Sequence, residues 1–314
     1  MSRGHFIGLN HHRLMLADRL RMESYREAIE RRVRPGMRVM DLGTGTGILA
    51  MWSAKQGADV LAVEPHAVVH VARRIADDNG LLDKIRFVQA DAKTLELADD
   101  EKVDLVVTEC MGNFFVTDEM MPVLRDLPRH LKPGGRTMPE RISLHLAAAT
   151  MPMWRELSFW DDEIGGFDYS AALDFAMQAA YVVHCEPELV ITGSAAVADF
   201  PLVEAPDGFA LEATLEVVKS GTVHGLVGWF DADLGEGVVL STAPGQRTHW
   251  GQMVFPLPPT PCRAGDSISV TLTLAMDEAL RSYFRWSGVI RTAGGEVDFE
   301  ADTRKRFGVS DETV

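Results

Sequence analysis

The sequence predicts an α/β protein in which a doubly wound parallel sheet is followed by a region of antiparallel β-structure. Between residues 39 and 135, short apolar runs alternate with segments of helical length, as in parallel strands joined by helices. After about residue 140, short runs of alternating apolar and polar residues are separated by turn residues, as in an antiparallel barrel or sandwich. A glycine-rich turn at residues 43–47 joins the first strand to the helix that follows it.

The first half of the chain is expected to begin with a helix. Residues 11–33 carry apolar side chains near helical spacing, and Pro35-Gly36 ends the pattern. Beyond it we expect strands at 39–42, 60–63, 85–89 and 103–108, and helices at 47–56, 67–78 and 119–131. The last helix is expected to break near Pro128 and to end at Lys132-Pro133-Gly134-Gly135. Ligands of such sheets bind at the carboxyl ends of the strands.

The second half is expected to contain antiparallel strands at 142–147, 211–218, 223–230, 268–274 and 297–301. Residues 151–180 interrupt this pattern with large aromatic side chains among acidic ones. Two interpretations stand: a helical arm that contacts a partner chain, or a segment whose aromatics fill the core of its own chain. We divide the chain into an N-terminal helix at 1–36, an α/β domain at 37–139 and a β-domain at 140–314.

Composition narrows the function classes. Of the 314 residues, 46 are acidic and 31 are basic, which gives a formal net charge of −15. This balance argues against nucleic acid as a partner and favours cationic substrates, with general solubility as the alternative. The three cysteines form neither a disulfide framework nor a metal-ligand spacing, which indicates a reducing, cytoplasmic location. The first residues lack an apolar signal core, and no run approaches the ~18 apolar residues of a membrane span.

The glycine-rich turn has the spacing Asp41-x-Gly43-x-Gly45-x-Gly47, followed by a strand that ends at Glu64. Glycines let a ligand approach the backbone, and Glu64 is placed to accept both hydroxyls of a ribose. A dinucleotide fingerprint has the different spacing G-x-G-x-x-G. Because Asp41 disfavours phosphate and favours an ammonium or sulfonium group, the pattern indicates S-adenosylmethionine. The structural alternative is a turn that only packs the helix on the strand.

The loop after the strand at 103–108 carries a candidate catalytic pair. Glu109 leaves the carboxyl end of this strand, and Asp118 lies nine residues further on, across a glycine-containing loop. Two converging carboxylates beside a sulfonium suit a guanidinium, which is planar, stays charged and offers a fork of N–H donors. They would fix its plane and let one nitrogen attack the methyl carbon in line. The alternative makes Glu109 a helix-capping or solvated loop residue.

These residues stand within motifs that resemble those of the protein arginine methyltransferases, over almost the whole chain. The matching stretches are His12-x-x-Met15-Leu16-x-Asp18-x-x-Arg21, residues 39–49, Glu109-Cys110-Met111-Gly112, Lys132-Pro133-Gly134-Gly135 and Thr248-His249-Trp250. The resemblance implies a Rossmann-like methyltransferase sheet, an antiparallel β-barrel-like domain, and a helical dimerisation arm at about 151–180 that makes a homodimer. A composition rich in alanine, valine and aspartate favours a bacterial member.

The resemblance also implies roles for single residues. The N-terminal helix would cover S-adenosylmethionine, with Arg21 contacting the carboxylate of that cofactor. His249 would lie beside the arginine pocket near Asp18, and both would assist the catalytic pair Glu109 and Asp118. The cofactor-binding set is His12, Arg21, Asp41, Gly43, Gly45, Glu64 and Asp91, and the substrate-pocket set is Phe6, Met15, Met120 and Trp250. Without the resemblance, a histidine at position 249 is more often a packed core residue, and the methionines are ordinary apolar side chains. The remaining histidines lack metal-ligand spacing, so no metal is expected.

Three departures from the family pattern bear on the acceptor. The second loop acid is Asp118, one methylene shorter than the usual glutamate; Phe6 stands where a tyrosine is expected; and Asn113 replaces an aromatic residue. The predicted function is therefore arginine N-methylation of a protein, a peptide or free arginine. The alternatives are a small-molecule N- or O-methyltransferase on the same fold, and a catalytically silent scaffold that binds the cofactor.

Overall fold

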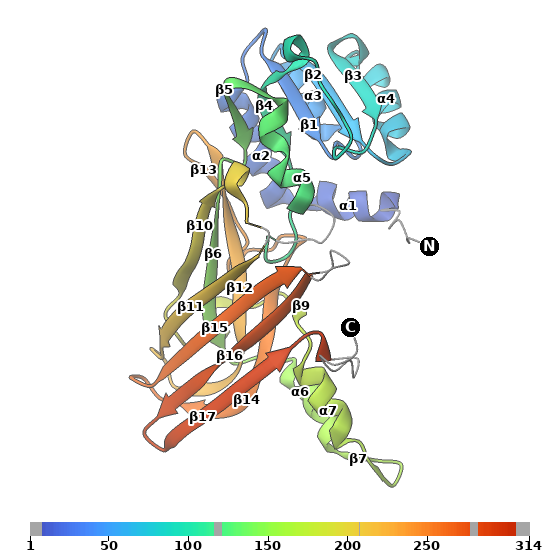
Figure 1. The fold of residues 1–314 in the computed structure, drawn as a ribbon. Helices are drawn as coiled ribbons and strands as arrows, with labels where there is room; N and C mark the ends of the chain where they lie inside the picture. Colours follow the sequence, from blue (N-terminus) through green and yellow to red (C-terminus); the bar gives the residue numbers. More distant parts are fainter. Residues whose placement is uncertain (1–7, 116–120, 207, 277–281, 306–314) are drawn as a thin grey trace.

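A five-stranded parallel sheet forms the upper part of the molecule in the computed structural model, which describes residues 8–115, 121–206, 208–276 and 282–305 (Figure 1). Its strands are β1 (Arg38–Leu42), β2 (Asp59–Glu64), β3 (Ile85–Gln89), β4 (Val103–Thr108) and β5 (Leu131–Met138), and their order is β3-β2-β1-β4-β5. The helices beside this sheet are α3 (Ile48–Lys55), α4 (Val68–Asp78) and α5 (Met121–Arg125). The strand order reverses between β1 and β4, so the carboxyl ends of these two strands border the crevice where such sheets bind ligands.

The N-terminal segment forms two helices where the sequence predicts one. Helix α1 (Leu9–Ala17) ends before Asp18, and α2 (Arg19–Arg32) begins after it. Asp18 is extended at φ −71° and ψ 96°, and its carboxylate accepts the backbone N–H of Arg21. Asp18 is thus an N-cap, a role that periodicity did not reveal and that aspartate fills well. Helix α2 packs on α3 and also contacts the β-domain strands β12 (Gly221–Gly235) and β13 (Val238–Ser241).

The fifth parallel strand is a second departure from the prediction. The helical segment expected over 119–131, with a break near Pro128, forms α5 and the short 3₁₀ helix η3 (Leu127–His130) in the described residues, and β5 follows directly. Lys132-Pro133-Gly134-Gly135 lies inside β5 instead of ending a helix. β5 is the edge strand of the sheet, where proline and glycine are tolerated.

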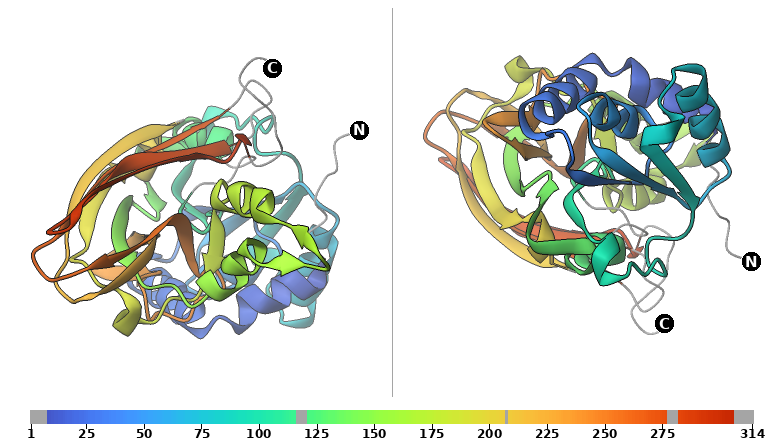
Figure 2. Two further views of the ribbon diagram at one scale, coloured as in Figure 1. Left: turned by 90° about the horizontal axis from the view of Figure 1, so that it is seen from below. Right: turned by 90° about the horizontal axis from the view of Figure 1, so that it is seen from above.

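The lower part of the molecule consists of two antiparallel sheets. One contains β6 (Arg141–Ala149), β9 (Tyr181–Val183), β10 (Ala195–Pro201), β12 (Gly221–Gly235), β13 (Val238–Ser241) and β14 (Gln252–Cys262). The other has the order β11 (Phe209–Glu216), β15 (Ser267–Met276), β16 (Ser282–Thr292) and β17 (Gly295–Asp302). Viewed from either end, the strands curve around a shared interior (Figure 2), so the predicted order of a parallel sheet followed by antiparallel β-structure is confirmed.

Residues 151–180 project from the β-domain as a mostly helical segment (Figure 1). It contains α6 (Trp154–Leu157), the 3₁₀ helix η4 (Ser158–Asp161), the hairpin of β7 (Glu163–Ile164) and β8 (Phe167–Asp168), and α7 (Ser170–Met177). The remaining short 3₁₀ helices are η1 (Leu82–Lys84), η2 (Asp99–Glu101), η5 (Pro187–Leu189) and η6 (Leu202–Glu204). Among the described helices, none combines the length and apolar character needed to cross a membrane.

Candidate active site

A cavity of about 440 Å³ opens between α1 and the carboxyl ends of β1, β2 and β4. This volume falls in the range of small-ligand sites. Of the residues predicted from the sequence, those that line it are His12, Met15, Arg21, Gly43, Gly45, Glu64, Asp91, Glu109 and His249. The structure therefore brings one residue group from the N-terminal helices, one from the parallel sheet and one from the β-domain to a single cavity.

The glycine-rich turn forms the floor of this cavity. Gly43, Gly45 and Gly47 have φ values of 76°, 54° and 87°, in the left-handed region that side chains disfavour. Asp41 does not face the ligand space; it is buried behind the turn, where one oxygen accepts the Thr44 hydroxyl at 2.6 Å and the Ala50 N–H at 2.9 Å. Burial raises the pKa of Asp41 to about 6, although both hydrogen bonds oppose the shift. Asp41 thus shapes the turn. Its side chain does not line the cavity, so the predicted contact with the cofactor does not fit this geometry.

Glu64 ends β2 with both carboxylate oxygens held by backbone N–H groups. Its Oε2 accepts the Gly45 N–H at 3.1 Å, and its Oε1 accepts the His66 N–H at 3.1 Å. Each carboxylate oxygen has a further lone pair. The side chain is therefore fixed in orientation and retains acceptor capacity toward the cavity, as a pair of ligand hydroxyls requires.

Helix α1 closes one side of the cavity through His12 and Met15. His12 packs directly on the glycine turn: a Cβ added at Gly45 would lie 2.9 Å from its Cε1 atom. Its Nε2 is buried and has no hydrogen-bond partner in the described part of the chain. Burial, followed by the neighbouring His11, lowers the pKa of His12, so the ring is neutral at pH 7.

A buried ion pair crosses the cavity between α2 and the end of β4. Arg21 Nη2 lies 2.7 Å from Glu109 Oε2, and the two side chains are only 6% and 7% exposed. Burial opposes the charge on Arg21, but the charge of Glu109 and its hydrogen bond raise the guanidinium pKa above the ordinary value. Arg21 Nε is a second buried atom with no partner among the described residues. Glu109 is thus neither a helix cap nor a solvated loop residue.

The loop at 248–250 brings a histidine and a tryptophan from the β-domain. Asp18 Oδ2 accepts the backbone N–H of His249 at 2.8 Å and lies 2.9 Å from the His249 Nδ1 atom. Burial alone would raise the pKa of Asp18, but these bonds and the one from the Arg21 N–H hold it below its usual value. Asp18 is therefore ionised and orients the His249 ring, which lines the cavity.

Trp250 was predicted to line the substrate pocket, but it is buried behind the loop. Its Nε1–H donates to the Met111 carbonyl at 2.8 Å, and its ring meets Phe230 edge-on at 5.4 Å. An indole needs a partner for its N–H when buried, and here the partner is the backbone of the loop that carries Glu109. Phe6, Asp118 and Met120 lie outside the described residues.

Several lining residues were not predicted. They include His11, Leu16, Thr44, Thr46, His66, Lys93, Cys110 and Met111. Most stand directly beside a predicted residue such as His12, Gly45 or Glu109, and this adjacency was the available signal. Burial raises the pKa of Cys110 to about 12, which makes this thiol a packing group and not a nucleophile at pH 7. Within the described residues, no cluster of histidine, cysteine or acidic side chains could hold a metal ion.

A glycine turn, a ribose-type acid and a buried carboxylate at the switch point of a parallel sheet define a methyltransferase-type site. Residues 39–135 match the model of a methyltransferase domain, and residues 140–284 match that of the arginine methyltransferase oligomerization subdomain. Protein arginine N-methyltransferase 1 of Saccharomyces cerevisiae is 32% identical over 283 residues, which cover 85% of this chain and 81% of that protein. Its namesake from Schizosaccharomyces pombe is 34% identical over 257 residues, covering 78% and 75%.

Solved structures agree with these matches. A chain of the Trypanosoma brucei PRMT1 enzyme-prozyme heterotetrameric complex with AdoHcy superimposes with a TM-score of 0.86 at 28% identity, covering 94% of this chain and 97% of that one. Protein arginine methyltransferase 10 of Arabidopsis thaliana, in an open conformation, gives a TM-score of 0.81 at 25% identity with the same coverage. The chain belongs to the protein arginine N-methyltransferase family.

The contact between Gly45 and His12 predicts the effect of a methyl group at this turn. Gly45→Ala should weaken the binding of S-adenosylhomocysteine at least about tenfold, or about 1.4 kcal/mol, because the new Cβ displaces His12 and α1. Gly80→Ala is the control, since Gly80 has a similar φ of 68° but open space around it. Isothermal titration calorimetry measures both, and equal affinities in the two variants would contradict the role given to His12.

The raised pKa of Asp41 predicts a pH dependence of stability. A carboxyl that ionises near 3.8 when unfolded and at about 6 when folded binds more protons in the folded state between these values. Its contribution to the unfolding free energy therefore falls as the pH rises through this window, by on the order of 2–3 kcal/mol. Asp41→Asn keeps an oxygen for both hydrogen bonds and should lack this fall. Urea unfolding of the ligand-free proteins at pH 4, 5, 6 and 7 tests this, and parallel pH curves would refute it.

Proposed function

We propose that this protein transfers a methyl group from S-adenosylmethionine to a guanidino nitrogen of arginine. The observation that carries the proposal is the placement of Glu109. This buried carboxylate directly follows β4, the strand next to the central strand β1. It already binds one guanidinium at 2.7 Å and shares its cavity with the ribose-type acid Glu64. A site that holds a guanidinium next to a nucleoside pocket is what this reaction requires.

The residues present fit S-adenosylmethionine. His12 and Arg21 line the cavity, and each has one buried nitrogen, His12 Nε2 and Arg21 Nε, with no partner in the described protein. Buried polar atoms are normally hydrogen-bonded, and a bound ligand would supply partners here. Glu64 would accept the ribose hydroxyls, and Arg21 would donate to the carboxylate of the amino acid end. When bound, this cofactor supplies a methyl group activated by its sulfonium charge.

Glu109 would position the acceptor by electrostatics. Arg21 donates to the Oε2 atom of Glu109. We therefore assign the other carboxylate oxygen, Oε1, to the N–H groups of the substrate guanidinium. Asp118 would contribute the second carboxylate, which fixes the plane of the guanidinium and draws its charge away from the attacking nitrogen. Such preorganised charges lower the barrier without moving during the reaction.

His249 and Asp18 would handle the proton. The substrate binds as the fully protonated guanidinium. The nitrogen that gains a methyl group must therefore lose one proton. His249 lines the cavity, and the ionised Asp18 at 2.9 Å orients its imidazole. We assign the acceptance of this proton to His249.

Incubation with labelled S-adenosylmethionine tests the acceptor class. Parallel reactions contain free arginine, an arginine–glycine-rich peptide, or metabolites from a cell extract. Label on a guanidino group supports the proposal, and the arm that is labelled identifies a protein, peptide or free acceptor. Label only on a metabolite without a guanidino group favours a small-molecule methyltransferase, and tight cofactor binding with no transfer favours a silent scaffold.

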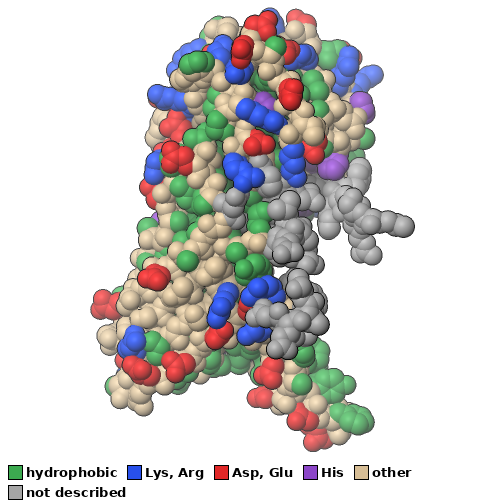
Figure 3. Space-filling view, viewed as in Figure 1, with side chains coloured by type: hydrophobic (Ala, Val, Ile, Leu, Met, Phe, Trp, Pro, Cys, Tyr) green, Lys and Arg blue, Asp and Glu red, His purple; other side chains and the backbone are tan. Residues whose placement is uncertain are grey.

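We also infer a homodimer formed through the arm at 151–180. The arm exposes Phe159, Phe167, Tyr169 and Phe175 by 40–69% among acidic side chains (Figure 3). The other interpretation, that these aromatics fill the core of the same chain, does not fit such exposure. Helix α1 exposes Leu9, Leu14 and Leu16 by 39–58%, and apolar surfaces of this kind suit the arm of a second copy. The match of this region to an oligomerization subdomain supports the inference.

Glu109→Gln should lower kcat for guanidine methylation by about 10³-fold, because the charge that holds the acceptor is lost. Its affinity for S-adenosylmethionine should change by less than about threefold, since the amide oxygen still accepts from Arg21. Glu140→Gln is the matched control, because Glu140 pairs with Arg32 at 2.7 Å outside the cavity. Retained turnover in Glu109→Gln would remove this residue from the mechanism.

Replacing Phe159, Phe167 and Phe175 together by serine should convert the dimer to monomers, because these rings form the apolar surface of the arm. The control is Val218→Ser with Val239→Ser, two residues exposed by 61% and 55% away from the arm. Sedimentation velocity at micromolar concentration distinguishes the two states. A triple variant that stays dimeric would show that the arm is not the interface.

A further inference from the structure

The turn that follows Glu109 has a backbone conformation that its own sequence disfavours. Gly112 and Phe115 exchange two backbone hydrogen bonds, each 3.0 Å long, around Asn113 and Phe114. Phe115 closes this turn at φ 68°. A bulky residue in the left-handed region costs about 1–3 kcal/mol and persists only where the surroundings hold it. The anchors of this turn must therefore lie outside it.

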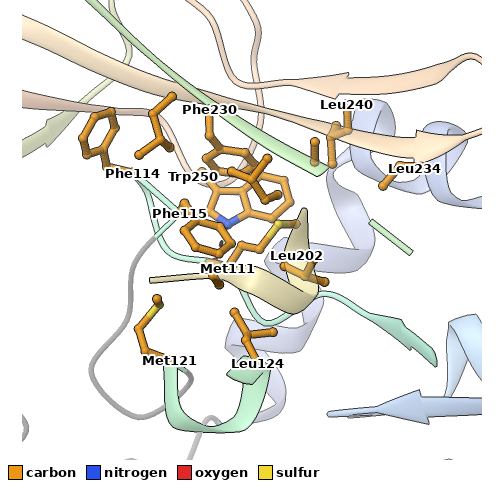
Figure 4. Packing of buried hydrophobic residues seen from close by; sticks show 14 of the residues in the cluster. Met111, Phe114, Phe115, Met121, Leu124, Leu202, Phe230, Leu234, Leu240 and Trp250 are labelled. Carbon is orange, nitrogen blue, oxygen red and sulfur yellow. Dashed lines mark hydrogen bonds between the residues drawn. The ribbon is translucent and has the colours of Figure 1, made fainter. Parts of the chain in front are cut away.

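Aromatic side chains of the β-domain anchor this loop, and Figure 4 shows one of them, Trp250, which binds the backbone of Met111. Phe115 is fully buried and meets Phe200 edge-on with ring centroids 5.4 Å apart. Phe114 is fully buried and meets Phe255 edge-on at 6.0 Å. On the other side of Gly112, the Met111 carbonyl accepts the Trp250 indole N–H. The β-domain therefore contacts this loop at Met111, before the turn, and at Phe114 and Phe115 in the turn itself.

Gly228 on β12 provides the space that Phe114 occupies. A Cβ added at Gly228 would lie 2.8 Å from Cε2 and 2.9 Å from Cδ2 of the Phe114 ring. Gly228 has no positive φ, so the backbone itself would accept alanine. The atoms that would clash belong to a rigid ring packed on a second ring, and they cannot move aside as the end of a flexible side chain could.

We propose that Gly228 is a positioning residue for the acceptor site: its missing side chain sets how deeply Phe114 inserts, and thereby where the loop holds Glu109. The link to methyl transfer rests on the proposed function. An alanine at 228 displaces Phe114 by several tenths of an ångström to reach an ordinary contact, and the displacement passes through the strained turn to Met111 and Glu109. Glu64 and the glycine turn, which would hold the cofactor, stay in place because they belong to the parallel sheet.

Gly228→Ala should lower kcat for guanidine methylation by about tenfold to a hundredfold, the cost of a small misplacement in an active site. The dissociation constant for S-adenosylhomocysteine should change less than about threefold. Adding Phe114→Leu to Gly228→Ala shortens the obstructing side chain and should restore kcat to within about threefold of the wild type. Gly193→Ala is the control, because a Cβ there meets nothing within 4 Å and φ is not positive.

Amide hydrogen exchange gives a readout that does not depend on activity. The N–H groups of Gly112 and Phe115 should exchange at least tenfold faster in Gly228→Ala and return toward the wild-type rate in the double variant. If the wild type methylates no guanidine, the proposed function fails, while the exchange rates still decide the anchoring. The inference would be overturned if the Gly228→Ala variant kept the exchange rates and the kcat of the wild type. A folding defect in this variant that Phe114→Leu does not rescue would also overturn it.

Discussion

The buried ion pair between Arg21 and Glu109 is the constraint on which the site depends. Removing two charges from water costs several kcal/mol per ion, so a pair at 2.7 Å is retained only with good geometry and further partners. Helix α2 must begin where Asp18 caps it for Arg21 to reach Glu109. Tyr25, one turn further on, donates to the Thr108 carbonyl at 2.9 Å and holds α2 against the end of β4.

This constraint also explains why the β-domain belongs to the active site. The Asp18 carboxylate that caps α2 is the one that holds His249, 231 residues away in the chain. Trp250, the residue after His249, donates its indole N–H to the backbone of the loop that carries Glu109. One carboxylate and one indole therefore couple the start of α2, the loop after β4 and the 248–250 loop. Loss of either coupling would leave a cofactor pocket without an organised acceptor side.

Unfavourable local features gather around the cavity. Asp41 is buried with one oxygen that lacks a partner among the described residues, and Phe115 has a left-handed backbone. Natural sequences keep such costs chiefly where function requires them. Here Asp41 lies behind the glycine turn at the floor of the cavity, and Phe115 lies in the loop that carries Glu109.

The sequence by itself determined the fold class and the glycine turn, and it singled out Glu64 and Glu109, which both line the cavity. These follow from periodicity and from residues that stand at the ends of strands, where chain order and spatial position coincide. It did not determine the break at Asp18, because a capped start of a new helix has the same apolar spacing as a continuous helix. The strand β5 was also missed, since its Lys-Pro-Gly-Gly segment has the composition of a turn.

Only the tertiary structure decided which side of each motif faces the ligand. Asp41 and Trp250 stand in matching motifs yet point into the protein, where hydrogen-bond partners from other segments satisfy them. Phe114 packs against Gly228, although the two residues are 114 positions apart in the chain. No spacing rule connects such residues, because close packing depends on the shapes of surfaces that meet only when the chain has folded.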